Sequence, residues 1–207
     1  MGFLKGLLGL GVTAGAAFAA LKVAQKYEEN KAADAAAAAA GAEPQDVPAG
    51  SVLEDIARAL SLLCRGGGHI RHFYSVAQHS INCAKEAKAR ELPERMQLAC
   101  LLHDASEAYI SDIIRPVKEH LNNYLEIEAK IMSAVWKHFH LENLTEEEQR
   151  IWKEIDDAVL VYEFHHLMTG SLEMEVQELC SEPDVSERNW REIETEFQQW
   201  AERLIGR

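Results

Sequence analysis

The stretch CLLHDASEAY, residues 100–109, places His103 and Asp104 side by side in a run that is otherwise largely apolar. Glu107 follows four residues after His103, so on a helix these two side chains would lie on the same side. Burying an imidazole and a carboxylate without partners costs free energy. We therefore expect other polar groups, or a bound ion, to compensate them in the folded protein.

Length and charge limit what the protein can be. With 207 residues, 47% of them hydrophobic, the chain is long enough for one well-buried domain plus an appendage and too short for two large domains. The formal net charge of −13 argues against a nucleic-acid polymer as a ligand, because such binding depends on many Lys and Arg contacts to phosphates. A small anionic ligand stays compatible, since a metal ion or a few cations can reverse the field inside one cleft.

The cysteines form no CxxC pair and lie inside or beside apolar helical patterns. Buried free cysteine behaves as a small hydrophobic residue. We therefore interpret Cys64, Cys83, Cys100 and Cys180 as reduced core thiols, which predicts a cytoplasmic protein.

The first 49 residues differ in composition from the rest of the chain. We predict a Gly- and Ala-rich helix and a Pro-bearing linker in residues 1–49, and one functional domain in residues 50–207. Residues 6–21 carry no charge, but a stretch of sixteen is short for a membrane-crossing helix. Three interpretations of residues 1–25 stay open: an anchor to a membrane or a partner protein, a cleaved signal peptide, and a surface helix.

Helical patterns fill the chain after residue 50. Ser51 and Glu54 match a capping box that would open the first helix, and three consecutive glycines at 66–68 would interrupt the chain after it. Further helices are predicted for residues 76–90, from Pro93 through the quoted stretch, for 121–140, from a capping box at 145–148, and at the C-terminus. The 121–140 helix would place on its core side Leu121, Leu125, Ile131, Val135 and Phe139. No useful alternating β pattern appears, so the fold class is all-α, a helical bundle.

Two further polar residues lie among apolar neighbours on predicted helices, namely His79 and Asp156. Each has an ordinary explanation alone: His79 as an interior or capping histidine, and Asp156 as a cap or a partner of a surface Lys, with Asp157 as an alternative candidate. Together with His103 and Asp104 they form a mixed nitrogen and oxygen set that suits a divalent transition metal and neutralises its charge. A metal ion would explain why these groups are tolerated inside the protein.

A His, then His-Asp, then a distant Asp resembles the HD-domain superfamily of metal-dependent phosphohydrolases, over most of residues 50–168. The string HDASEAYISDIIRPVK is most similar to the branch that contains bacterial 5′-deoxynucleotidases. The resemblance implies an HD-domain bundle with an extra N-terminal helix, and one divalent ion (Mn, Co, Ni, Zn or Fe) held by His79, His103, Asp104 and Asp156. It also implies a catalytic or water-positioning role for Glu107, and a substrate or supporting role for Asp112.

The reaction that the resemblance implies is hydrolysis of a phosphomonoester, that of a (deoxy)nucleoside 5′-monophosphate, by a metal-activated water. Phosphate oxygens need cationic partners, for which we select Arg71 and Lys118, followed by Arg65, His69 and Arg115. The glycine run lacks the Lys-Ser/Thr ending of a P-loop and is interpreted as a wall of the cleft.

Two alternatives stay open. Other HD enzymes hydrolyse a nucleoside triphosphate, an alarmone or a cyclic nucleotide, and the fold does not decide between these substrates. A non-catalytic module that senses a metal and a nucleotide, tethered by its N-terminal helix, belongs to another functional class. Family similarity also suggests a homodimer.

Overall fold

The computed structural model describes residues 49–118, 120–168 and 177–206. The predicted N-terminal helix and linker, with their possible membrane or partner contact, lie outside the described residues. Within the described residues, no helix combines the length and the apolar character needed to cross a bilayer.

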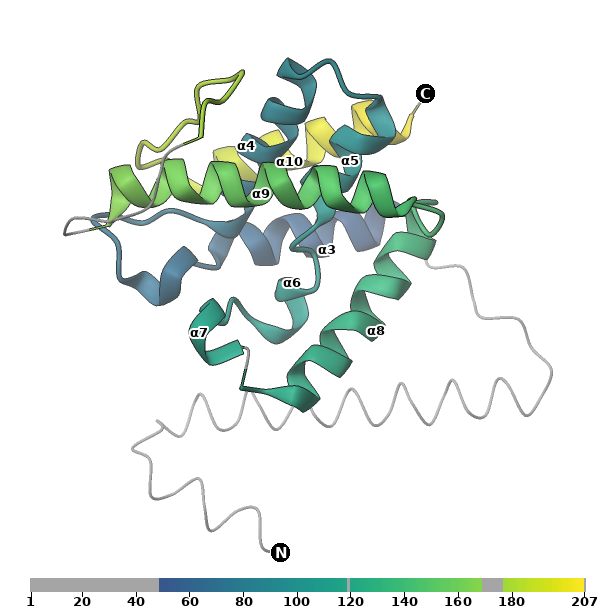
Figure 1. The fold of residues 1–207 in the computed structure, drawn as a ribbon, viewed down its shortest axis with the longest axis horizontal. Coiled ribbons are helices and arrows are strands. Elements are labelled where there is room, and N and C mark those ends of the chain that lie inside the picture. Colours follow the sequence, from purple (N-terminus) through teal and green to yellow (C-terminus); the bar gives the residue numbers. More distant parts are fainter. Residues whose placement is uncertain (1–48, 119, 169–176, 207) are drawn as a thin grey trace, which may run out of the picture. The chain divides into compact units, whose positions relative to one another are not determined.

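The described chain is helical and contains no β-strand, which confirms the predicted all-α helical bundle (Figure 1). Its elements are α3 (Ala49–Leu62), the 3₁₀ turn η1 (Arg65–Gly68), α4 (Val76–Ala89), α5 (Glu94–Leu102), α6 (Glu107–Ile110), α7 (Arg115–Lys118), α8 (Asn122–His138), α9 (Glu146–Leu167) and α10 (Trp190–Ile205).

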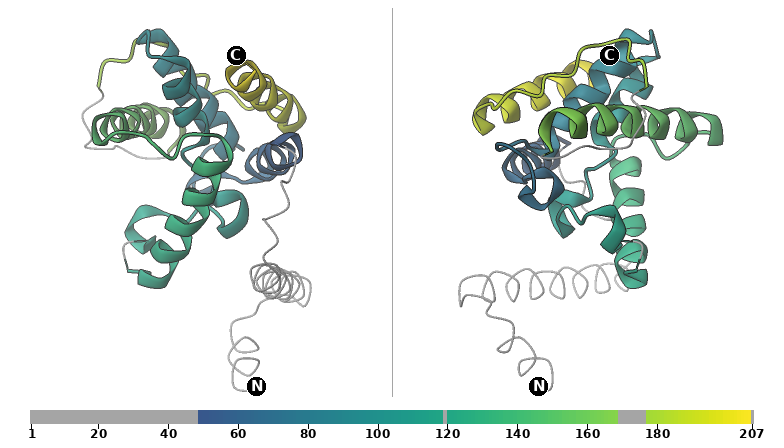
Figure 2. Two further views of the ribbon diagram at one scale, coloured as in Figure 1. Left: turned by 90° about the vertical axis from the view of Figure 1, so that its right-hand side faces the viewer. Right: turned by 60° about the vertical axis from the view of Figure 1, so that its left-hand side comes forward.

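Helix α4 lies at the centre and packs against α3, α5, α9 and α10 (Figures 1 and 2). It begins at Ser75, whose hydroxyl accepts a hydrogen bond from the backbone N–H of Gln78 at 3.2 Å. Because α4 is covered on several sides, its buried residues include polar side chains as well as the apolar Val76 and Ile81. Polar groups on this helix therefore need partners from the surrounding helices.

The long helix α9 crosses over α4 and α5 (Figure 1). The predicted capping box is present at its start: Thr145 accepts from the backbone of Glu148, and Glu148 accepts from the backbone of Thr145. The amphipathic pattern of the C-terminal helix is likewise confirmed, and its buried face consists of Ile193, Phe197, Ala201 and Leu204. This face packs on α3 and α5 and closes the core.

Two predicted helix limits are wrong. Helix α3 begins at Ala49, so Ser51 lies inside the helix and not at its N-cap. Helix α5 ends at Leu102, so His103 and Asp104 follow the helix and do not continue it. The reason is local: the ring Nδ1 of His103 binds the carbonyl oxygen of Cys100 at 2.7 Å, the group that a continuing helix would use for its next backbone bond.

Two predicted core positions are also wrong. Leu125 in α8 is 40% exposed, whereas Val135 and Phe139 near the end of the same helix are buried as expected. Helix α8 leads away from the central helices (Figure 2), and among the described side chains of its first half the buried one is that of Tyr124 and not that of Leu125. Cys180 is exposed, because it lies in the loop before α10, while Cys83 and Cys100 are buried and none of the four thiols is in a disulfide.

The glycine run forms a tight loop at the edge of the bundle. Gly66, Gly67 and Gly68 all have positive φ, a conformation that other residues adopt at a cost. The loop is closed at its base by the backbone bond from Arg65 N to Tyr74 O at 2.9 Å. This closure directs the buried Arg65 side chain inward, toward the end of α5.

Candidate metal centre

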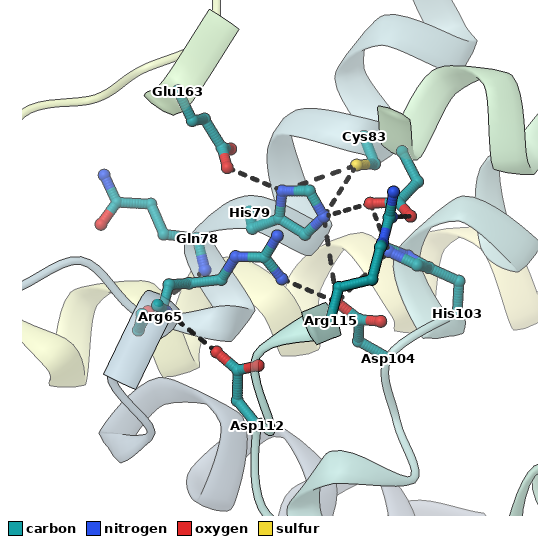
Figure 3. A network of polar contacts seen from close by, with 12 residues as sticks. Arg65, Gln78, His79, Cys83, His103, Asp104, Asp112, Arg115 and Glu163 are labelled. Carbon is teal, nitrogen blue, oxygen red and sulfur yellow. Dashed lines mark hydrogen bonds and ion pairs between the residues drawn. The ribbon is translucent and has the colours of Figure 1, made fainter. Parts of the chain in front are cut away.

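Three segments far apart in the sequence bring the predicted ligands together. His79 lies in α4, His103 and Asp104 follow α5, and Asp156 lies in α9. His79 Nε2 is 3.0 Å from Asp156 Oδ1 and 3.8 Å from Asp104 Oδ2. His103 Nε2 is 3.5 Å and 3.3 Å from the same two oxygens. His79, His103 and Asp104 point toward one another in Figure 3.

The orientation of His103 fits a cation. Its Nδ1 faces the carbonyl oxygen of Cys100, and because a carbonyl only accepts hydrogen bonds, Nδ1 carries the hydrogen. In the neutral ring, Nε2 then carries no hydrogen and offers a lone pair. This nitrogen is buried, has no hydrogen-bond partner and faces the oxygens of Asp104 and Asp156. A cation between the ring and the carboxylates would satisfy all of these groups, so the residues fit a divalent metal ion.

Without a cation, protons on the imidazoles balance the negative charges of the carboxylates in the site. Burial acts to lower the pKa of His103, but the negative charges of Asp104 and Asp156 outweigh it and raise this pKa well above 6.5. Burial acts to raise the pKa of Asp156, but the positive charge of His103 and the hydrogen bond from His79 hold it well below 3.8. Cation binding must therefore release protons from the imidazoles.

Sequence reasoning missed Cys83 and Glu163. Cys83 follows His79 by one turn of α4, and its Sγ is 3.5 Å from His79 Nε2. Cys83, His79, His103 and Asp156 form a group whose ligand atoms lie within 4.8 Å of one another. Glu163 lies on α9 seven residues after Asp156 and binds His79 Nδ1 at 2.9 Å. The spacings of four and seven residues, which place side chains on one helix face, were the available signals.

Of the predicted cationic residues, Arg65 makes the closest contact: its Nη1 is 3.0 Å from Asp104 Oδ2. Arg115 contacts the carboxylates of α9, with its Nη2 at 3.9 Å from Asp156 Oδ2 and 2.9 Å from Asp157 Oδ1. Asp157 is 43% exposed and lies outside the cluster, so Asp156 is the residue that the fold brings to the predicted ligands.

The other predicted phosphate-binding residues lie farther out. Lys118 forms an ion pair with Glu128 in α8. Arg71 and His69 are exposed, on the loop between η1 and α4. Within the described part of the chain, Arg65 and Arg115 contact the predicted ligands, whereas Arg71 and His69 do not.

Glu107 is 5% exposed, and its Oε2 is buried without a hydrogen-bond partner. Burial, with the negative charges of Asp104 and Asp112, raises its pKa from 4.5 to about 9. It also lines a cavity of about 370 Å³ formed with residues that include Ala59, Leu63 and Tyr109. Glu107 therefore holds a proton at neutral pH in the metal-free protein.

Asp112 lies away from the cluster and accepts a hydrogen bond from the backbone N–H of Gly66 at 3.1 Å. This bond ties the glycine loop to the segment between α6 and α7. The observed contact of Asp112 is thus to the loop that carries Arg65 (Figure 3).

Comparison with known proteins identifies the family to which this chain belongs. The HD domain model matches residues 68–203. The chain is 41% identical over 90 residues to the uncharacterized protein YfdR of Escherichia coli, covering 44% of this chain and 48% of the relative. It is 40% identical over 95 residues to an uncharacterized protein of Rhodobacter capsulatus, covering 43% of this chain and 48% of the relative. These matches span about half the length of each relative. Over the larger part of its length, this chain belongs to the HD domain family, whose members bind divalent metals and are generally hydrolases.

Proposed function

We propose that this protein hydrolyses the phosphomonoester of a (deoxy)nucleoside 5′-monophosphate, using one divalent ion (Mn, Co, Ni, Zn or Fe) held by His79, His103, Asp104 and Asp156. The observation that carries the proposal is the buried, unpartnered Nε2 of His103 facing two carboxylates. We include Asp104 because two carboxylates neutralise a dication, and its Oδ2 lies near both imidazoles. Cys83 is the competing fourth ligand.

When bound, a divalent ion supplies Lewis acidity: it lowers the pKa of water and polarises a phosphoryl oxygen. The chain itself provides the proton and the phosphate contacts. Glu107, protonated at neutral pH in the metal-free protein, is suited to hold a proton on Oε2 and to exchange it with the attacking water or the leaving sugar oxygen. Water and the phosphomonoester would give an alcohol and inorganic phosphate.

Arg115 is the favoured phosphate-binding residue. Its side chain is 57% exposed and reaches the edge of the site, so it can exchange its contact with Asp157 for a substrate oxygen. Arg65 is more deeply placed and paired with Asp104, which suits a supporting role at the same phosphate. We keep Asp112, His69, Arg71 and Lys118 as candidates for contacts with the rest of the nucleotide.

Phosphate release tests this function directly. The purified full-length chain is screened with nucleoside 5′-monophosphates, triphosphates and cyclic nucleotides, each with Mn²⁺, Co²⁺, Ni²⁺, Zn²⁺, Fe²⁺ or Mg²⁺. Release from monophosphates supports the proposal. Turnover of the other nucleotides alone supports a different HD activity, and nucleotide binding without any turnover supports a regulatory module.

Two variants test the assigned roles. His103→Ala is expected to lose the metal and the activity, whereas Glu107→Ala should keep the metal and lose turnover. The exposed His120→Ala serves as the matched control for His103→Ala and should behave as the unmodified chain. We also propose a cytoplasmic location and a homodimer, which fractionation and light scattering check.

A further inference from the structure

A buried chain of hydrogen bonds leads away from the metal centre, starting at the far nitrogen of His79. Glu163 Oε2 is 2.9 Å from His79 Nδ1, and Tyr74 Oη is 2.5 Å from Glu163 Oε1. Asn82 Nδ2 continues the chain at 2.8 Å from Tyr74 Oη. All four side chains are at most 1% exposed. Water therefore cannot replace any of these partners readily.

The direction of every hydrogen in this chain follows from the backbone at its far end. The N–H of Asp184 donates to Asn82 Oδ1 at 3.1 Å, which fixes which end of the Asn82 amide is the oxygen. Asn82 Nδ2 therefore donates to Tyr74 Oη, and the Tyr74 hydroxyl donates its own hydrogen to Glu163. The remaining oxygen of Glu163 accepts from His79.

One consequence concerns the state of His79. Because Glu163 accepts, Nδ1 of His79 carries a hydrogen, and Nε2 is left as the nitrogen that faces Asp156 at 3.0 Å. Since Nε2 is the nitrogen that faces the carboxylates of the cluster, it is the one that can offer a lone pair to a cation there. The tautomer of the other imidazole has a different origin, because His103 Nδ1 donates to the backbone carbonyl of Cys100. A side-chain substitution at Cys100 would not remove that carbonyl.

We propose that Glu163, with its own orientation set by Tyr74 and Asn82, is the positioning residue that holds His79 in its metal-binding tautomer. Helix α9 then has two tasks: it presents Asp156 as a ligand and, two turns later, Glu163 as the residue that orients a second ligand. This inference rests on the ligand role of His79 in the proposed function. Glu163 acts through His79 and does not itself meet the cation.

The substitution Glu163→Gln gives a specific expectation. The Tyr74 hydroxyl still needs an acceptor, so the glutamine oxygen faces Tyr74 and its NH₂ group faces His79 Nδ1. Two donors cannot face each other, so His79 must move its hydrogen to Nε2, the atom needed for the cation. We expect Co²⁺ affinity to fall about 10- to 100-fold, the usual loss when a metal ligand loses its orienting partner.

A second substitution should reverse part of this loss. In Tyr74→Phe/Glu163→Gln no hydroxyl competes for the glutamine oxygen, so the amide can turn and accept from His79 Nδ1. The double variant should therefore bind Co²⁺ more tightly than Glu163→Gln alone. Tyr74→Phe by itself should change the affinity by less than about tenfold, because Glu163 still accepts from His79.

The matched control is Glu86→Gln. Glu86 is equally buried in α4, but its carboxylate accepts from the backbone N–H groups of Cys180 and Ser181 and makes no contact with His79. This variant should lose stability and keep its Co²⁺ affinity within about twofold. A general loosening of the core would instead affect the two Glu→Gln variants alike.

Metal affinity is measured on the full-length chain by competition of Co²⁺ with a chelating dye. Nitrogen-15 NMR of histidine-labelled, Zn²⁺-loaded protein reports the tautomer of His79, and circular dichroism confirms that each variant folds. Unchanged affinity and an Nδ1–H signal in Glu163→Gln, or no recovery in the double variant, would overturn the proposal, as would a lack of Co²⁺ binding by the unmodified chain. Metal binding without phosphate release would contradict the proposed function alone.

Discussion

Replacing Glu107 by glutamine should stabilise the metal-free protein, and increasingly so as the pH rises. The carboxyl group is 5% exposed, and burial with the charges of Asp104 and Asp112 raises its pKa from 4.5 to about 9. A raised pKa means that the folded state holds the proton more tightly than the unfolded state. The favourable contribution is complete below pH 4.5 and is lost as the pH rises through about 9.

The magnitude follows from the same two values. Each pKa unit corresponds to about 1.4 kcal/mol, so the two and a half units between pH 4.5 and pH 7 correspond to roughly 3 kcal/mol. Near pH 9 the loss approaches about 6 kcal/mol. Glutamine stays neutral and similar in shape, so Glu107→Gln should gain little at pH 4.5, roughly 3 kcal/mol at pH 7 and more at pH 8.5.

Urea unfolding followed by circular dichroism measures this difference, with EDTA present so that no cation contributes. The control is Glu54→Gln on the exposed face of α3, which should shift the free energy of unfolding by less than about 0.5 kcal/mol at every pH. A gain for Glu107→Gln that stays constant between pH 5 and pH 8.5 would refute the reasoning. The same variant should release no phosphate, because an amide cannot exchange the proton.

Three further predictions concern the metal and the phosphate. Arg115→Ala should raise KM for a nucleoside monophosphate about tenfold, in line with the loss of one charge-assisted hydrogen bond. Arg150→Ala, whose side chain is similarly exposed but pairs with Glu147 and Glu154, is the control and should leave KM nearly unchanged; equal effects in steady-state kinetics would contradict the phosphate-binding role of Arg115. Cys83→Ser should keep Co²⁺ affinity within a few-fold if Asp104 is the fourth ligand, and a loss above about 100-fold would assign that place to the thiol. Saturating Zn²⁺ should raise the thermal midpoint and EDTA should reverse it, since free metal at about 1,000 times Kd adds about 4 kcal/mol; an unchanged midpoint in scanning calorimetry would argue against a folded-state metal site.

Much of the fold was readable in the sequence because local rules dominate it. The capping box at Thr145, the glycine run after Arg65 and the amphipathic C-terminal helix each act over a few residues, and each is found where the pattern predicted it. The errors arose where distant groups decide. Leu125 has a core-like spacing but is 40% exposed on a helix that leads away from the central helices, and Cys180 lies in a loop whose backbone amides donate to Glu86.

For the candidate site, too, some features could be predicted from the sequence and others could not. A resemblance in motif order pointed to His79, His103, Asp104 and Asp156, and these residues do converge in space, although their role as ligands stays a prediction. Helical periodicity misplaced the end of α5, because the His103 ring takes the Cys100 carbonyl that a longer helix would use.

By itself the sequence determined the helical class and most helix limits, since these depend on neighbours within one or two turns. Only the tertiary structure decided which groups meet. Glu163 of α9 pairs with His79 of α4, and Arg115 contacts Asp156 of α9. The Glu107 carboxyl oxygen Oε2 is buried without a hydrogen-bond partner. Each of these arrangements depends on how the helices and the loops between them pack. Hydrogen bonds and Coulomb forces act over a few ångströms of space, and segments separated by some eighty residues come within that range only when the core has packed.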